Sequence, residues 1–170
     1  MRVLADALTI ARLVIAIAFP WVLLGGGRWP VVLWAAAAAS DFVDGPLARR
    51  AGGGTGHGSV LDSLADVTFV LGGLTVGAVR GDLTWLAPLS VAGAAGAYAF
   101  DSLRVSRSTG AVHLARSRIG RTAGVVNYVC VGVLAGRAIL PDAIWGWAIA
   151  LLAVATVVVN AAALAVRLRG

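Results

Sequence analysis

Six long apolar segments dominate this sequence and constrain its fold more than any other feature. A helix that crosses a bilayer needs about 20 mostly apolar residues, and within lipid its backbone polar groups have to be paired inside the helix. Charged residues make up 13% of the chain, well below the soluble average of about 25%. We therefore expect an all-α integral membrane bundle of six transmembrane helices, forming a single domain over residues 1–170. The expected spans run approximately from Leu8 to Leu24, Pro30 to Leu47, Val60 to Val79, Trp85 to Leu103, Thr122 to Leu140 and Ala143 to Val166.

The distribution of arginine predicts how this bundle is oriented. Cytoplasmic loops of membrane proteins are enriched in Lys and Arg. If the N-terminus is cytoplasmic, eleven of the 14 basic residues lie on the inner side, and the other three are Arg28, Arg80 and Arg137. The tryptophans that then lie near the outer interface, as in an aromatic belt, are Trp21, Trp29, Trp85, Trp145 and Trp147. We therefore expect a multi-pass protein of the cell membrane with its N-terminus in the cytoplasm.

The net charge of +6 raises the question of nucleic acid binding. The arginines, however, lie between apolar runs and do not form a continuous basic stripe. We expect membrane lipid and phosphate groups as the anionic partners, and no nucleic acid.

Four aspartates fall at the predicted cytoplasmic ends of the second and third helices. Asp41 and Asp44 are three residues apart, so they share one helix face. Asp62 and Asp66 are four residues apart and share a face in the same way. Carboxylates gathered near hydrocarbon repel one another and are costly to desolvate without a compensating cation. Oxygen ligation suits Mg²⁺ or Mn²⁺, so we expect one or two such ions; helix caps and interfacial salt bridges are the alternative.

The same stretch carries a longer pattern. It reads Asp41-x2-Asp44-Gly45-x2-Ala48-Arg49-x8-Gly58-x3-Asp62-x3-Asp66, with eight defined residues over 26 positions. The pattern matches every fixed position of the CDP-alcohol phosphotransferase signature, so the chain resembles this family, which is also called the CDP-alcohol phosphatidyltransferase family. The six-helix plan of the family agrees with the hydropathy pattern.

This resemblance implies a metal-dependent transferase of phospholipid synthesis, with its active site facing the cytoplasm. It would move a phosphatidyl group from CDP-diacylglycerol to an alcohol hydroxyl and release CMP. Asp66 would be the general base and would also contact metal. The residues that would hold metal against the pyrophosphate are Asp41, Asp44 and Asp62, and those that would lie along CDP are Gly45, Ala48, Arg49 and Gly58. Members of the family often form homodimers, so a homodimer is expected.

A second, shorter resemblance lies near the N-terminus, in Asp6-Ala7-Leu8-Thr9-x2-Arg12. Many members have Pro-Asn where this chain has Ala5-Asp6, in a segment that helps bind the nucleotide. Thr9 and Arg12 are therefore candidate CDP-binding residues, and a helix cap with an interfacial anchor is the alternative. The departure at position 6 leaves the role of Asp6 open.

A cluster of arginines between the fourth and fifth helices is the candidate acceptor site. Arginine binds phosphate through two parallel hydrogen bonds, so the cluster suits a phosphorylated acceptor such as glycerol 3-phosphate or an inositol phosphate. The alternative is the general excess of positive charge on cytoplasmic loops. The cluster consists of Arg104, Arg107, Arg116, Arg118 and Arg121.

A different function for the whole chain is also open. A non-enzymatic membrane protein would use the aspartates to bind or transport a cation. Such an ion pathway predicts polar residues that recur through the depth of the bilayer, whereas these aspartates are concentrated at one face.

Overall fold

The computed structural model of this protein describes residues 2–50, 56–109 and 117–168, and the side chains of residues 10–40, 60–107 and 117–168. Within these ranges the chain forms six α-helices and one short 3-10 helix, with no strand, which confirms the all-α prediction. The elements are α1 (Arg2–Gly25), α2 (Trp29–Arg50), α3 (Gly56–Val79), α4 (Leu86–Thr109), α5 (Arg118–Ala135), η1 (Gly136–Ala138) and α6 (Asp142–Leu168).

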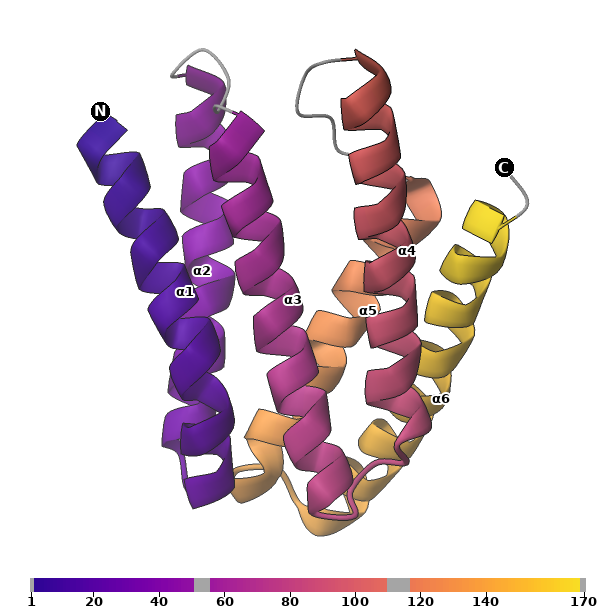
Figure 1. The fold of residues 1–170 in the computed structure, drawn as a ribbon. Helices are drawn as coiled ribbons and strands as arrows, with labels where there is room; N and C mark the ends of the chain where they lie inside the picture. The colour runs from indigo at the N-terminus through magenta and orange to yellow at the C-terminus, as the bar shows by residue number, and fades with distance from the viewer. Residues whose placement is uncertain (1, 51–55, 110–116, 169–170) are drawn as a thin grey trace.

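The helices run alternately down and up, so that their ends form two groups (Figure 1). The upper end of the bundle in Figure 1 holds the starts of α1, α3 and α5 and the ends of α2, α4 and α6. α1 packs against α2 and α3, α6 packs against α4 and α5, and α3 also contacts α4 and α5. The signature segments of α2 and α3 therefore lie at the end of the bundle where α1 begins.

Several helices have the length and composition of membrane spans. The segments that are long and apolar enough to cross a bilayer are Val60–Val79, Arg118–Ala138 and Asp142–Leu168. Shorter apolar segments, Ile10–Gly25 and Trp29–Ser40, lie in α1 and α2, where the described side chains cover only part of each helix. These helices agree with the predicted membrane bundle.

α1 and α3 approach each other closely at a glycine. A Cβ atom built at Gly72 of α3 would lie 2.4 Å from Cγ of Pro20 in α1, closer than real Cβ atoms come to other groups. On the next position of α3, a Cβ at Gly73 would lie 2.8 Å from Cγ1 of Val131 in α5. Small residues permit such contacts between membrane helices. These two glycines therefore let α3 pack between α1 and α5.

Aromatic rings join four helices in the middle of the bundle. The rings of Phe19 and Phe69 lie 4.2 Å apart, and those of Phe69 and Tyr128 lie 5.3 Å apart. Trp34 of α2 completes the group: its indole Nε1 donates a hydrogen bond of 3.0 Å to the carbonyl oxygen of Tyr128. The cluster ties α1, α2, α3 and α5 together beneath the upper end.

A buried polar pair joins α5 to α6. Nδ2 of Asn160 donates to Oδ1 of Asn127 at 2.7 Å, and Nδ2 of Asn127 donates to Oδ1 of Asn160 at 3.3 Å. Asn160 also donates to the carbonyl oxygen of Thr156 within α6. Because these amides satisfy each other, they fix how α5 and α6 face one another.

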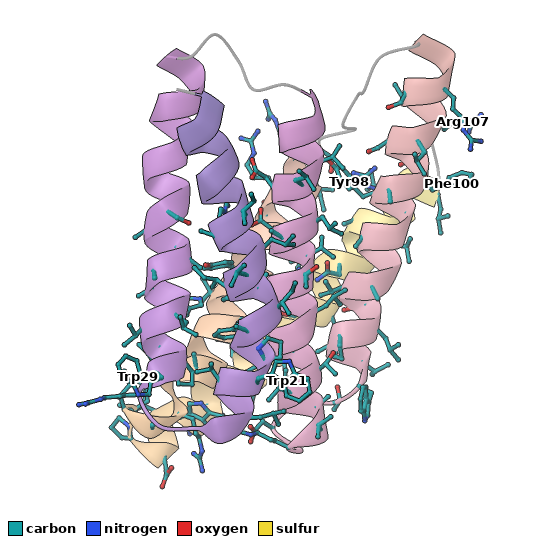
Figure 2. All side chains as sticks on the ribbon, turned by 60° about the vertical axis from the view of Figure 1, so that its left-hand side comes forward. Trp21, Trp29, Tyr98, Phe100 and Arg107 are labelled. Carbon is teal, nitrogen blue, oxygen red and sulfur yellow. The ribbon has the colours of Figure 1, made fainter. Side chains whose placement is uncertain are left out.

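The tryptophans at the lower end differ in exposure. Trp21 and Trp29 lie near the lower end of the bundle in Figure 2, and they are exposed, as are Trp85 and Trp147. Trp145 differs from the predicted belt because it is 7% exposed and its Nε1 donates to the carbonyl oxygen of Val133. Trp145 is therefore a core residue between α6 and α5.

Candidate active site

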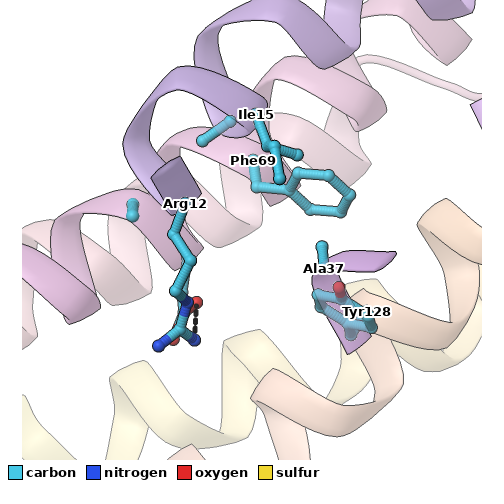
Figure 3. Close-up of a pocket in the computed structure, with 8 residues that line it drawn as sticks. Arg12, Ile15, Ala37, Phe69 and Tyr128 are labelled. Atoms are coloured by element: carbon cyan, nitrogen blue, oxygen red, sulfur yellow. Dashed lines mark hydrogen bonds and ion pairs between the residues drawn. The ribbon is translucent and has the colours of Figure 1, made fainter. Parts of the chain in front are cut away.

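Two acidic residues of the signature converge on Arg12. Nη1 of Arg12 lies 3.6 Å from Oδ1 of Asp62, and Nη2 lies 3.3 Å from Oδ1 of Asp66. The contact with Asp66 is also a hydrogen bond, which the guanidinium donates (Figure 3). The Arg12 side chain is only 12% exposed, whereas those of Asp62 and Asp66 are 42% and 53% exposed. A largely buried cation thus meets two accessible carboxylates.

The helical repeat explains why these three side chains meet. Asp62 and Asp66 lie one turn apart on one face of α3. Phe69 lies two turns after Asp62 on that face of α3, and Phe19 lies two turns after Arg12 on α1. The two helices run in the same direction, and the two Phe rings are in contact with their centres 4.2 Å apart. The packing that joins the rings therefore also places Arg12 beside the carboxylates.

A hollow opens next to this charged group (Figure 3). Arg12 and Asp66 line it on the polar side, and its other walls come from Ile15, Phe69 and Tyr128, together with small alanines. The Tyr128 hydroxyl donates to the carbonyl oxygen of Trp34 at 3.4 Å. The hollow therefore combines a charged edge with an apolar wall built from four helices.

The rest of the signature lies at the same end of the bundle. α2 carries, toward its C-terminal end, Asp41, Asp44, Gly45, Ala48 and Arg49, and α3 carries Gly58 in its first turn. Thr9 lies in α1. The side chains of these residues fall outside the described part of the chain, and so does that of Asp6. The backbone brings them to the end where Arg12 meets Asp62 and Asp66, and their predicted contacts stay predictions.

The described carboxylates fit a hard metal ion. Oδ1 of Asp62 and Oδ1 of Asp66 already point at one cationic group, the guanidinium of Arg12. Carboxylate oxygens are the ligands that Mg²⁺ and Mn²⁺ prefer. Asp62 and Asp66 could therefore each supply an oxygen ligand at the upper end of α3, while the described residues contain no cluster of three or more such ligands.

The predicted acceptor arginines lie on other helices. Arg104 and Arg107 lie toward the end of α4, and Arg118 and Arg121 lie in the first turn of α5; all four are exposed. Arg107 is seen on the upper part of α4 in Figure 2. Arg116 lies outside the described residues. The structure thus brings four of the five arginines to the same end as Asp62, but on α4 and α5.

One ion pair near these arginines was not predicted from the sequence. Nη1 of Arg167, in the last turn of α6, lies 2.7 Å from Oδ2 of Asp101 in α4, and its guanidinium lies 5.0 Å from the Tyr98 ring centre. The Arg167 side chain is 10% exposed. The acidic Asp101 within an apolar helix indicated that a partner was needed. The sequence could not identify that partner, because Arg167 is 66 positions away. The pair anchors the upper part of α4, which carries Arg104 and Arg107, to α6.

Comparison with known proteins agrees with the signature. The chain is 36% identical over 87 residues to the phosphatidylinositol phosphate synthase of Corynebacterium glutamicum. That match covers 50% of this chain and 37% of the relative, so the chain matches little more than a third of the relative's length. A family model, described as CDP-alcohol phosphatidyltransferase, matches residues 2–160. That match runs from the start of α1 into α6 and includes Arg12, Asp62 and Asp66, and the chain therefore belongs to the CDP-alcohol phosphatidyltransferase family.

Proposed function

We propose that this protein transfers a phosphatidyl group from CDP-diacylglycerol to the hydroxyl of an alcohol and releases CMP. In this reaction the acceptor oxygen forms a bond to the lipid-bearing phosphorus, and the bond from that phosphorus to the CMP oxygen breaks. The observation that carries the proposal is the convergence of Asp62 and Asp66 on one cation, in a chain that belongs to this family. Family membership favours this transferase over a non-enzymatic cation-binding or transport protein.

Each signature residue has a role in the proposal. Asp66 takes the proton from the acceptor hydroxyl, and its 53% exposed side chain is accessible to a bound alcohol. Asp62 holds the metal on the same helix face, together with Asp41 and Asp44 of α2. The CDP moiety lies along the residues that the family signature and the N-terminal segment supply, which are Thr9, Arg12, Gly45, Ala48, Arg49 and Gly58.

Members of the family are generally dependent on a divalent metal. Bound Mg²⁺ or Mn²⁺ would neutralise charge on the pyrophosphate oxygens as the bond to CMP breaks. The four aspartates of the signature would hold it through carboxylate oxygens. The role of this chain's own residues is then to fix the donor, to exclude other orientations of the acceptor, and to remove its proton.

We further propose a phosphorylated acceptor, with an inositol phosphate as the first candidate. The supporting observations are the name of the relative from Corynebacterium glutamicum and the exposed arginines at the ends of α4 and α5. The test gives purified protein CDP-diacylglycerol with inositol phosphate, glycerol 3-phosphate, inositol or glycerol, and measures CMP release. Release that requires a phosphorylated alcohol supports the proposal. Equal release with free inositol would contradict it.

Neutralising two of the arginines tests where the acceptor binds. We expect Arg104→Gln combined with Arg121→Gln to raise the KM for the phosphorylated acceptor about tenfold or more, since a hydrogen bond between charged groups contributes about 1.5–3 kcal/mol. The KM for CDP-diacylglycerol should stay unchanged. Arg28→Gln, an exposed arginine at the opposite end, is the matched control. Equal changes in both KM values would place the arginines outside the acceptor site.

We also propose that the upper end of the bundle faces the cytoplasm. The bias of arginine toward that end supports this orientation. A cysteine placed at Ser117, on a chain whose Cys130 is replaced by Ala, should react with an impermeant thiol reagent in inside-out vesicles. A cysteine at Asp142, at the lower end, should react in right-side-out vesicles. The reverse labelling pattern would show that the upper end faces away from the cytoplasm.

The homodimer that the family resemblance implies stays a prediction.

A further inference from the structure

The place that Arg12 occupies suggests a role beyond nucleotide binding. Its guanidinium lies between Asp62 and Asp66, two of the carboxylates that the proposed function assigns to metal and to catalysis. We propose, resting on that function, that Arg12 is an internal counter-cation: it holds this carboxylate pair in the metal-free protein and gives up the contact when a divalent ion binds.

The metal-free protein needs such a counter-charge. Two carboxylates one turn apart on one helix face repel each other, and one of them, Asp66, lines the hollow whose apolar wall includes Phe69 and Tyr128. Arg12, whose side chain is 12% exposed, reaches them from α1 with its Nη atoms 3.3 and 3.6 Å from the Oδ1 oxygens. This contact offsets the repulsion and holds the carboxylates ready for a metal ion.

Metal and arginine then compete for the same oxygens. Oδ1 of Asp66 accepts the hydrogen bond from Arg12. A magnesium ion binds carboxylate oxygen at about 2.1 Å, so an ion shared by Asp62 and Asp66 would lie within a few ångströms of the guanidinium. Two cations so close repel strongly where water is partly excluded. Binding of the metal and retreat of Arg12 from the carboxylates are therefore one coupled exchange.

The sign of a metal-affinity change distinguishes this role from others. If Arg12 is the counter-cation, a neutral residue at position 12 destabilises the metal-free state and removes a repulsive neighbour from the metal-bound state, so affinity rises. If Arg12 served to orient the carboxylates for the metal, its loss would lower affinity. If Arg12 contacted the nucleotide alone, its loss would leave metal affinity unchanged when no nucleotide is present.

The test measures Mn²⁺ binding to the full chain in detergent micelles without any CDP-lipid, by the electron paramagnetic resonance signal of free Mn²⁺. We expect Arg12→Gln to bind Mn²⁺ about tenfold more tightly than wild type, at the low end for a charged hydrogen bond because both carboxylates are half-exposed. Arg12→Lys keeps the cation and should lie closer to wild type. Arg137→Gln is the matched control, since Arg137 also pairs with an aspartate, Asp142, at 2.8 Å, but at the lower end.

A measurement on the wild-type chain covers the case in which Arg12→Gln does not fold. The ¹⁵N resonance of the Arg12 side chain, assigned by its absence in Arg12→Lys, should shift as Mg²⁺ is added. Unchanged or weaker Mn²⁺ binding in a folded Arg12→Gln protein, or an Arg12 resonance that ignores Mg²⁺ at saturation, would overturn the exchange while leaving the proposed transferase intact. A wild-type chain that binds no Mn²⁺ would instead overturn the metal site itself.

Discussion

Asp66→Asn is expected to lower the rate of CMP release at least about a hundredfold, since a positioned general base contributes about 10²–10⁴ in rate. The amide keeps the shape of the carboxylate but cannot take the proton from the acceptor hydroxyl. The fall should appear in kcat, measured with saturating CDP-diacylglycerol and acceptor. The Asn side chain can still accept the hydrogen bond from Arg12, so the contact between α1 and α3 is retained.

A matched control separates catalysis from the general loss of an ion pair. Asp142 also pairs with an arginine, Arg137, but at the lower end of the bundle, and its side chain is 89% exposed. Asp142→Asn should therefore retain the wild-type rate. An Asp66→Asn protein that is folded, binds CDP-diacylglycerol normally and still turns over at the wild-type rate would remove Asp66 from the catalytic role.

Gly72→Ala should destabilise the helix bundle although it leaves the charged residues untouched. Its new Cβ would lie 2.4 Å from Cγ of Pro20, and a proline ring is tied to the backbone and cannot turn aside as a flexible side chain would. Overpacking of this kind costs about 1–3 kcal/mol. At about 2–4 °C per kcal/mol for a chain of this size, the unfolding midpoint should fall by about 2–12 °C.

The thiol of Cys130 can be used to measure the unfolding midpoint. Cys130 is the single cysteine and is fully buried, so a thiol-reactive dye should label it as the protein unfolds on heating in detergent. Gly96→Ala in α4 is the control, because a Cβ at Gly96 meets nothing within 4 Å. Equal midpoints for the two variants would contradict the close contact of α1 with α3. Activity should fall with Gly72→Ala, since that contact places Arg12 beside Asp62.

The helices were largely predictable because apolar length alone distinguishes a membrane span. The residues at which the helices begin and end were less predictable. Hydropathy placed the start of the fifth helix at Thr122, but the helix begins at Arg118, where the Ser117 hydroxyl accepts a hydrogen bond of 3.0 Å from the Gly120 N–H. Charged residues can occupy a first helical turn that reaches out of the apolar layer, and hydropathy does not detect such a turn.

The site was predictable in part for a similar reason. The spacing of Asp62 and Asp66 is local, so one helix face could be inferred from the sequence, and the N-terminal resemblance made Arg12 a candidate site residue. The partner of Asp101 was not predictable, because a contact between α4 and α6 depends on how the helices pack. The burial of Trp145 was missed for the same reason: apolar character shows that a residue avoids water but does not distinguish lipid from the protein core.

The central claim is that the end of the bundle holding Arg12, Asp62 and Asp66 transfers an intact phosphatidyl group to an alcohol. The most direct measurement follows CDP-diacylglycerol labelled in its acyl chains, with Mg²⁺ and inositol phosphate, and compares moles of CMP with moles of labelled lipid product. We predict one new labelled phospholipid per CMP, no product with a chelator, and product formation at least about a hundredfold slower with Asp66→Asn. Labelled phosphatidic acid in place of that phospholipid would show hydrolysis of the donor, and would contradict the transferase.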